Sequence, residues 1–267
     1  MEVTVKRDRI VVKVGTSTLT NELGNSNLRT MEKLALVLSD IQNMGHEVIL
    51  VSSGAIAVGA NKMHLPEKPK TMRMKQAAAA VGQCTNMFLY DKFFGYYDKM
   101  VAQILLNAED ITQEEKKENL SNTFSALLEQ GVIPIVNEND SVSYTEIESE
   151  ERLFSDNDVL SAVVAVLCQA DKLVILSDID GFFDKDPRLF KDAKLISRID
   201  RIDDDVYKLA GGAGSRRGTG GMRTKLQAAD LATAQGIETI VTNGKNPEIL
   251  YKVVNGEPVG TKFVGLR

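Results

Sequence analysis

The sequence predicts an α/β fold of three layers, in which helices cover both faces of a mainly parallel central sheet. Short apolar runs rich in Val, Ile and Leu recur along the chain, for example at residues 10–14 and 48–51. Such unbroken runs are typical of strands buried on both faces, and longer segments with helical periodicity separate them. The 267 residues include only six prolines and no Pro-rich linker. We therefore expect one continuous domain with two lobes.

Four strands and three helices are predicted in the first half of the chain. The strands lie at residues 10–14, 48–51, 101–106 and 132–136. Apolar residues at helical spacing from Leu28 to Ile41 indicate the first helix, and Gly45 stands where its C-cap would fall. A second helix, rich in Ala and Met, is predicted over residues 72–93. The third is predicted to begin at Thr112, because Thr112 and Glu115 have the spacing of a capping box.

The second half begins with residues 141–153, which alternate weakly between apolar and polar and carry four glutamates. We interpret this segment as an exposed antiparallel hairpin with solvated charges, and we expect no metal site there. A polar, glycine-rich stretch occupies residues 178–221. The remaining predicted elements are a helix at 155–167, a strand at 173–176, a helix at 222–235, a strand at 239–242 and a helix at 247–254.

The composition excludes several classes of protein. Lys and Arg number 32 against 37 Asp and Glu, a formal net charge of −5, which argues against a protein that binds duplex nucleic acid. No run approaches the ~18 apolar residues of a membrane span, and the mixed-charge N-terminus does not resemble a signal peptide. Cys84 and Cys168 have no paired spacing, so we expect neither disulfides nor a thiolate zinc site, and we expect a cytoplasmic location.

Polar residues follow four of the predicted strands, at the edge where ligands bind to open parallel sheets. These strand exits comprise residues 13–17, 52–55, 137–140 and 177–181. Free backbone amides and the N-termini of the following helices would make such exits suitable for anions. Gly, Ser, Asn and Asp are also common in ordinary turns, so for any one exit taken alone the interpretation as a turn is favoured.

Two segments are harder to explain as turns. Lys13 lies in an otherwise apolar strand, where an unpaired ammonium group costs several kcal/mol, so either a phosphate or an ion pair with Asp158 is expected beside it. Residues 218–225 place consecutive glycines before a helix that contains Lys225, which allows the backbone to approach an oxyanion. The chain has no P-loop and no G-x-G-x-x-G after the first strand, so Walker-type NTPases and Rossmann dehydrogenases are disfavoured.

The segment from Ser155 to Asp158 has two interpretations. As the start of a helix, Ser155 would be the N-cap and Asp158 would complement the helix dipole. That interpretation gives no specific role to Asp156 or Asn157. The spacing alone does not decide between a helix start and part of a site.

Six segments, taken in order, resemble the glutamate 5-kinase branch of the amino acid kinase family. They are residues 13–17, 52–57, 75–83, 137–140, 156–158 and 218–225. The resemblance extends from Lys13 to about Phe263. It implies ATP-dependent phosphorylation of the γ-carboxylate of L-glutamate to L-glutamyl 5-phosphate, the first step of proline biosynthesis. Many members carry a C-terminal PUA domain, whereas here we expect a short form: one kinase domain, with an acceptor lobe at about 1–168 and a nucleotide lobe at about 169–267.

The resemblance also implies roles for individual residues. Lys13 and Lys225 would flank the transferring phosphoryl group, on the nucleophile and leaving-group sides, and Asp158 would hold both ammonium groups in place. Glutamate would bind at Ser53, Gly54, Asn157 and Asp140, with Asp140 pairing the α-ammonium group. The implied nucleotide set is Lys13, Gly15, Ser177, Asp178, Thr219, Gly220, Gly221, Met222, Arg223, Thr224 and Lys225.

The implied cofactors are ATP and Mg²⁺, with the metal held mainly by nucleotide phosphates and water, because the sequence shows no dedicated carboxylate cage. A glutamate side chain has a pKa of ~4.3, so the nucleophile is already ionised at pH 7 and needs no general base. We further expect a homo-oligomer, transfer of the product to glutamyl phosphate reductase, and no nucleic-acid or membrane partner. Feedback inhibition by proline, near residues 72–83, is a further expectation from the resemblance.

Two other functions remain open at this point. A kinase of the same fold could act on another small anion, such as carbamate, N-acetylglutamate, aspartate or a nucleoside monophosphate. A non-catalytic sensor could bind an amino acid, but such a protein could dispense with Lys13, Lys225 and Asp158, and all three are present.

Overall fold

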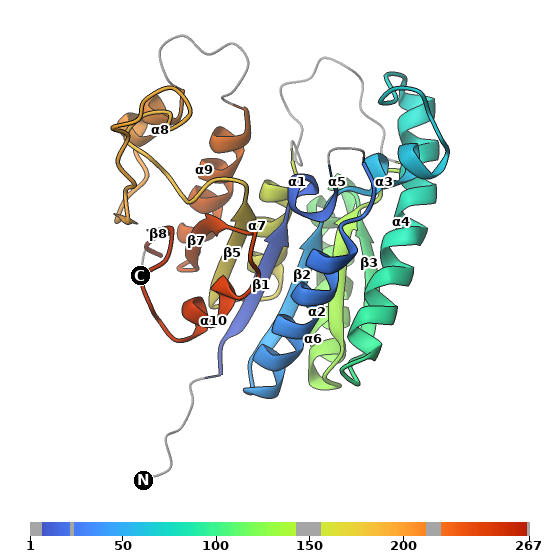
Figure 1. Cartoon of the computed structure of the whole chain (residues 1–267). Helices are drawn as coiled ribbons and strands as arrows, with labels where there is room; N and C mark the ends of the chain where they lie inside the picture. Colours follow the sequence, from blue (N-terminus) through green and yellow to red (C-terminus); the bar gives the residue numbers. More distant parts are fainter. Residues whose placement is uncertain (1–6, 22–23, 143–155, 212–219, 266–267) are drawn as a thin grey trace.

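An eight-stranded sheet forms the centre of the molecule, with the strand order β3-β4-β2-β1-β5-β7-β8-β6 (Figure 1). The computed structural model describes residues 7–21, 24–142, 156–211 and 220–265. The strands are β1 (Arg9–Val14), β2 (Glu47–Ser52), β3 (Val101–Leu106), β4 (Ile133–Glu138), β5 (Lys172–Ser177), β6 (Arg198–Ile199), β7 (Glu238–Asn243) and β8 (Thr261–Phe263). The helices are α1 (Thr16–Leu19), α2 (Leu28–Asn43), α3 (Ala55–Lys62), α4 (Met72–Gly95), α5 (Ala108–Thr112), α6 (Glu114–Glu129), α7 (Asn157–Leu167), α8 (Asp204–Gly211), α9 (Gly220–Thr233) and α10 (Ile249–Val254).

The sheet is mainly parallel, which confirms the predicted fold class. β1 lies between β2 and β5 and is parallel to both. β7 and β8 form the antiparallel pair, and β6 runs parallel to β8. After β1 the chain continues to β2 on one side of β1. After β5 it crosses on the other side to β6, at the far edge of the sheet, and then returns to β7 beside β5. The carboxyl ends of β1 and β5 are therefore a topological switch point, where open α/β sheets bind ligands.

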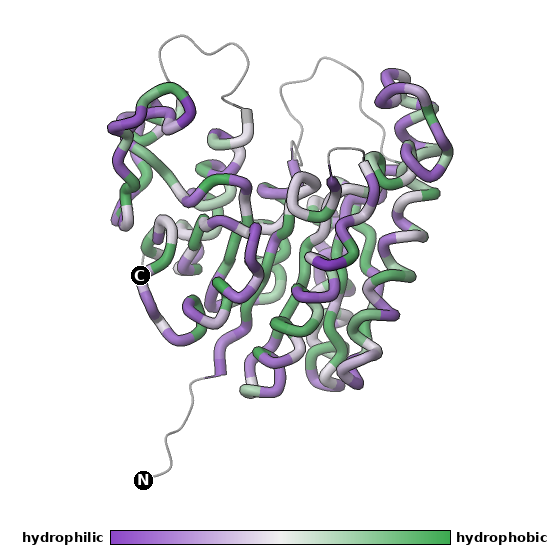
Figure 2. Tube along the Cα trace, viewed as in Figure 1, coloured by the Kyte–Doolittle hydropathy of each residue, from purple (hydrophilic) through white to green (hydrophobic). Residues whose placement is uncertain are grey.

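Helices cover both faces of the sheet, as predicted. Val12 and Val14 of β1 belong to an apolar cluster with α2, α4 and α10, whereas Val11 belongs to a second cluster with α6, α7 and α9. Figure 2 shows the central strands mostly in the hydrophobic colour and many hydrophilic residues along the outer helices. Because side chains alternate along a strand, Lys13 lies on the same face as Val11, toward α7.

Gly45 marks the end of α2 as predicted, although the C-cap itself is Met44, one residue earlier. Gly45 has a φ of 97°, in the left-handed region that glycine adopts without strain. Its N–H donates to the carbonyl of Gln42 at 2.9 Å, and His46 N–H donates to that of Ile41 at 3.4 Å. This pair of bonds is a Schellman motif, which satisfies carbonyls that the end of α2 would otherwise leave unpaired.

The prediction of a helix beginning at Thr112 is wrong. Thr112 is the last residue of α5, and α6 begins at Glu114. The carboxylate of Asp110 accepts a hydrogen bond of 2.8 Å from the backbone N–H of Asn107, which starts the helix directly after β3. Two capping patterns compete within a few residues of each other, and the earlier one starts the first helix.

The predicted N-cap at Ser155 is replaced by Asp156. Asp156 has an extended backbone, and its carboxylate accepts from the N–H of Asp158 at 3.4 Å, so α7 begins at Asn157. Asp158 is therefore the second residue of the helix. Ser155 itself, and nearly all of the hairpin predicted at 141–153, lie outside the described residues.

α3 and α4 pack unusually closely at two glycines. A Cβ atom built on Gly59 would lie 1.7 Å from the carbonyl oxygen of Ala78, and one on Gly82 would lie 1.8 Å from that of Ala55. Only glycine fits at such distances. This contact holds the start of α3, and with it the turn after β2, against the middle of α4.

Candidate active site

Lys13 and Lys225 meet at one buried carboxylate. Lys13 Nζ lies 2.6 Å from Asp158 Oδ1, and Lys225 Nζ lies 3.0 Å from Asp158 Oδ2. The exposed fractions of the side chains are 6% for Lys13, 12% for Lys225 and 0% for Asp158. The sequence predicted either a phosphate or Asp158 as the partner of Lys13, and the structure shows the ion pair with Asp158. Two ammonium groups from distant parts of the chain therefore point to one place beyond the carboxyl edge of the sheet.

Three elements produce this arrangement. Lys13 is the penultimate residue of β1, on the face that α7 covers. Asp158 lies in the first turn of α7, where a carboxylate also stabilises the helix dipole. Lys225 lies in the second turn of α9, which packs against α7. The predicted partner segments are thus joined by the layer of helices on one face of the sheet.

The charge of Asp158 depends on its two partners. Burial raises the pKa of this carboxyl, but the attraction of the Lys13 and Lys225 ammonium groups outweighs that effect and holds the pKa below its ordinary value. A buried carboxylate is stable in this form only when it is paired. Asp158 is therefore an anion at neutral pH, suited to hold two cations and unsuited to accept a proton.

Thr224 shares the same carboxylate. Its hydroxyl lies 3.0 Å from Asp158 Oδ2, 3.1 Å from the carbonyl of Gly221 and 3.4 Å from Asp156 Oδ2. Lys225 Nζ also donates to the Gly221 carbonyl, at 3.0 Å. The first turns of α7 and α9 are thus joined by hydrogen bonds as well as by charge.

A chain of amide side chains lies next to this cluster. Asn157 Nδ2 donates to Ser53 Oγ at 2.8 Å and to Asn137 Oδ1 at 2.9 Å, and Asn137 Nδ2 donates to Gln83 Oε1 at 3.0 Å. Both hydrogens of the Asn157 amide are used, so Ser53 Oγ accepts and keeps its own hydrogen for another partner. Successive residues of α7 therefore reach both groups, with Asn157 at the amide chain and Asp158 at the lysines.

Gln83 and Asn137 were not among the site residues predicted from the sequence. Asn137 stands in one of the polar strand exits, and Gln83 stands in the predicted helix at 72–93. Their sequence context is that of an ordinary turn and an ordinary helix surface. Only the packing of α4 beside β4 brings them into contact.

Two glycines keep the site open. A Cβ atom on Gly15 would lie 3.6 Å from Lys13 Nζ, and one on Gly221 would lie 4.0 Å from Lys225 Nζ. Gly54 has a φ of 94° and is the N-cap of α3, a conformation that residues with side chains rarely adopt. The absence of side chains leaves room beside both ammonium groups.

The remaining predicted residues that the structure describes lie at the same edge of the sheet. Ser177 ends β5, beside β1, and its hydroxyl donates to Asp178 Oδ1 at 3.2 Å. Asp178 is exposed and lies 3.5 Å from Arg188. Asp140 is half-buried in the turn that follows β4. Met222 packs partly against the core, Arg223 is exposed, Gly220 is the first residue of α9, and Thr219 lies outside the described residues.

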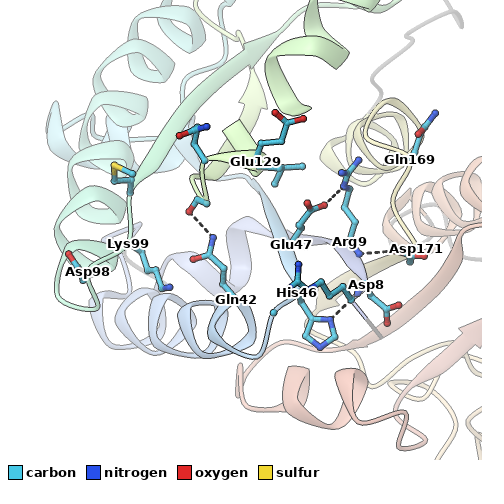
Figure 3. A pocket seen from close by; sticks show the side chains of 16 residues that line it. Asp8, Arg9, Gln42, His46, Glu47, Asp98, Lys99, Glu129, Gln169 and Asp171 are labelled. Carbon is cyan, nitrogen blue, oxygen red and sulfur yellow. Dashed lines mark hydrogen bonds and ion pairs between the residues drawn. The ribbon is translucent and has the colours of Figure 1, made fainter. Parts of the chain in front are cut away.

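A cavity of about 890 Å³ lies at the opposite, amino edge of the sheet (Figure 3). Arg9 and Glu47, at the starts of β1 and β2, are joined there by a 2.6 Å ion pair, and Arg9 N–H donates to Asp171 at 2.8 Å. Asp8 N–H donates to His46 Nδ1 at 3.2 Å. These polar groups bind one another, and none of the predicted site residues lines this cavity.

The described residues contain no group of three or more His, Cys, Asp or Glu side chains that could hold a metal ion. Among their helices, none is both long enough and apolar enough to cross a membrane.

The family model and the similar proteins described below indicate the same family. The model of the amino acid kinase family matches residues 8–243. A glutamate 5-kinase of Clostridium perfringens is 58% identical over 256 residues, covering 96% of this chain and 95% of that protein. A glutamate 5-kinase of Listeria innocua is 52% identical, covering 96% and 92%, and one of Caldanaerobacter subterraneus is 51% identical, covering 97% and 68%.

Solved structures share the fold at low sequence identity. A UMP kinase from Bacillus anthracis superposes with a TM-score of 0.64 at 18% identity, covering 97% of each chain. An isopentenyl phosphate kinase from T. acidophilum has a TM-score of 0.63 at 18% identity, covering 96% of this chain and 99% of that one. At this identity the likeness concerns the fold alone.

Proposed function

This chain belongs to the amino acid kinase family and acts as a glutamate 5-kinase, and on this premise we propose that Lys13, Lys225 and Asp158 form its phosphoryl-transfer centre. The observation that carries the proposal is the single buried carboxylate that holds both ammonium groups, at 2.6 and 3.0 Å.

In the reaction, an oxygen of the γ-carboxylate of L-glutamate forms a bond to the γ-phosphorus of ATP. The bond from that phosphorus to the β–γ bridging oxygen breaks, and ADP leaves with the electron pair. The attacking carboxylate is already ionised at pH 7, since its ordinary pKa is ~4.3, so no general base is needed. What the protein supplies is the positioning of two anions and positive charge around the transferring group.

Lys13 lies on the nucleophile side and Lys225 on the leaving-group side. Fixed donors of this kind act on charge that develops during transfer, without having to reorganise at that moment. Asp158 keeps the two donors aligned. Its pKa lies below the ordinary value, so it does not take up the proton that a base would need to accept.

Glutamate binds beside the amide chain, at Ser53, Gly54, Asn157 and Asp140. The 2.8 Å bond from Asn157 to Ser53 supports this assignment, because it directs the Ser53 hydroxyl hydrogen away from Asn157 and toward a ligand oxygen. Asp140 pairs the α-ammonium group of glutamate. Asn137, which accepts from Asn157, belongs to the same wall.

The proposed nucleotide site comprises the first turns of α9, at residues 220–225, together with Gly15, Ser177 and Asp178. Thr219, which belongs to the same proposed set, lies outside the described residues. The space beside Lys13 and Lys225 that a Cβ on Gly15 or Gly221 would fill suits phosphate oxygens. Mg²⁺ bound mainly to the phosphates of ATP and to water would supply positive charge that neutralises the triphosphate, beside Lys13 and Lys225.

The test is a trapping assay. The protein is incubated with L-glutamate, ATP, Mg²⁺ and hydroxylamine, and γ-glutamyl hydroxamate is measured with ADP release. A parallel panel replaces glutamate by N-acetylglutamate, aspartate, carbamate or UMP. ADP release with glutamate and hydroxamate formation are the expected results. Faster turnover of another acceptor, or amino-acid binding with no ADP release, would replace the proposal by one of the alternatives.

The chemistry of the product indicates what kind of enzyme must act after this one. An acyl phosphate hydrolyses readily, so glutamyl phosphate reductase is the expected consumer of the product in the cytoplasm. A homo-oligomer and inhibition by proline near residues 72–83 are also part of the proposal. Gel filtration with light scattering tests the first, and activity at millimolar proline tests the second.

A further inference from the structure

The hydroxyl of Thr224 lies beside three acceptors and has one hydrogen to donate. The acceptors are Asp158 Oδ2 at 3.0 Å, the Gly221 carbonyl at 3.1 Å and Asp156 Oδ2 at 3.4 Å. Two of them are carboxylate oxygens at the start of α7, one on its N-cap Asp156 and one on Asp158, while Thr224 belongs to α9. A bond from a neutral donor to a carboxylate is stronger than one to a carbonyl. The hydrogen therefore favours Asp158.

We propose that Thr224 is a positioning residue, which holds the Asp158 carboxylate through its hydroxyl and so keeps Lys13 and Lys225 aligned during phosphoryl transfer. The proposal rests on the phosphoryl-transfer centre described above. In this proposal the Thr224 side chain binds Asp158 and not the nucleotide. The backbone of the same turn belongs to the proposed nucleotide site.

The reason lies in what Lys225 does during the reaction. In the described structure Lys225 Nζ donates to Asp158 Oδ2 and to the Gly221 carbonyl, each at 3.0 Å. When this ammonium group turns toward the leaving phosphate, Oδ2 loses part of its charged partner. A buried carboxylate oxygen without a donor is costly. The Thr224 hydroxyl remains on Oδ2 and keeps the carboxylate in place, so that Lys13, on Oδ1, does not shift with it.

Helix α9 offers a matched control. Thr233 lies in the same helix, and its hydroxyl donates to the carbonyl of Asp230 at 3.3 Å. The Thr224 hydroxyl lies at a similar distance, 3.1 Å, from the carbonyl three positions earlier in the chain, that of Gly221. Thr224 has in addition the Asp158 carboxylate oxygen at 3.0 Å from its hydroxyl. Replacing each threonine by Val removes a hydroxyl that lies beside a backbone carbonyl, and only in Thr224 does it also remove a bond to a carboxylate.

The experiment compares Thr224→Val, Thr224→Ser and Thr233→Val in steady-state assays with glutamate and ATP. For Thr224→Val we expect kcat to fall at least about tenfold, since bonds to charged groups are among the strong ones, with KM for both substrates changed less than about twofold. Thr224→Ser restores most of kcat, and Thr233→Val stays near the parent value. A higher KM for ATP at unchanged kcat would mean that the hydroxyl binds nucleotide. That result, failure of Ser to rescue, or an equal loss in Thr233→Val would overturn the proposal.

A double-mutant cycle tests the positioning role of Thr224 separately from the proposed phosphoryl-transfer centre. In an Asp158→Asn background, adding Thr224→Val should cause no further loss of kcat, because both changes remove the same interaction. Full additivity would overturn the inference. If Asp158→Asn does not fold, the three single variants decide alone. If the parent protein forms no hydroxamate, or Asp158→Asn keeps the parent rate, the proposed centre fails. If Asp158→Asn is slow and Thr224→Val is not, only the role of Thr224 fails.

Discussion

Lys13 Nζ of β1 lies 2.6 Å from Asp158 Oδ1 of α7, and both side chains are almost completely buried. A single ion pair in such a place would be a weak source of stability, because the cost of removing two charges from water offsets their attraction. Here Lys225 adds a second ammonium group on the other carboxylate oxygen. The cluster thus carries one more positive than negative charge in a site that is open toward the carboxyl edge of the sheet, and this excess is what a transferring phosphoryl group requires.

Removing either ammonium group should slow the reaction. In Lys225→Ala and in Lys13→Ala we expect kcat to fall roughly a hundredfold, the usual effect of losing one preorganised donor worth ~3 kcal/mol in the transition state. Steady-state kinetics and circular dichroism measure activity and folding. Lys208→Ala is the control, because Lys208 is an exposed side chain that pairs with Asp205 within α8. Near-normal turnover in either site variant would remove that lysine from the mechanism.

The ion cluster should make stability depend on pH in the acid range. The pKa of Asp158 is below its ordinary value in the folded protein, so the cluster stabilises the fold fully above ~4, the pKa of the unfolded chain, and less as the pH falls through the folded value. Asp158→Asn should lower the free energy of unfolding by ~3 kcal/mol at pH 7. Urea unfolding at several pH values measures both proteins. The difference should shrink below pH ~4, and a constant difference would contradict this account.

Asp140 should affect one substrate and not the other. As the partner of the α-ammonium group, its removal in Asp140→Ala should raise KM for glutamate by roughly tenfold or more, the cost of losing a bond between charged groups. KM for ATP should stay nearly unchanged. Initial rates with each substrate varied at saturation of the other give both values. Equal increases would place Asp140 elsewhere in the site.

The close packing of α3 on α4 should tolerate no methyl group. In Gly59→Ala the new Cβ would meet the Ala78 carbonyl at 1.7 Å, so the helices must separate, and we expect a loss of stability of ~2 kcal/mol or more. Gly95→Ala is the control, because a Cβ there meets nothing within 4 Å. That change should be neutral or stabilise by up to ~1 kcal/mol, as Ala does in helices. Thermal unfolding measures the midpoint temperature of each variant. Gly59→Ala should lower this temperature clearly, and Gly95→Ala should leave it unchanged or raise it.

The two thiols should differ in reactivity. Cys84 is exposed, whereas burial raises the pKa of Cys168 to about 12. The thiolate is the reactive form, so at pH 8 the folded protein should release one equivalent of thionitrobenzoate from Ellman's reagent. In denaturant it should release two. Rapid reaction of both thiols in the folded state would mean that the core beneath α7 opens readily.

Several strands and helices were predictable because their signals are local. Continuous apolar runs placed the first strands within a few residues, and Gly45 marked the end of α2 through its freedom to adopt a positive φ. The break between α5 and α6 was not predictable, because capping patterns at Asn107 and Thr112 compete at short range. Gly59 and Gly82 also carried no local signal, since a glycine in a helix becomes informative only when its neighbour is known.

The chemistry was predictable from the sequence through the family resemblance of six ordered segments. A lysine in an apolar strand predicted a negatively charged partner, and a glycine-rich segment before a helix indicated room for an oxyanion. Which anion each lysine meets was decided by the alternation of side chains in β1 and by the packing of α7 against α9. The same packing brought Thr224 to Asp158 and Gln83 to Asn137. Hydrogen bonds and ion pairs act over about 3 Å, and residues so far apart in the sequence come within that range only when the sheet and its helices have assembled.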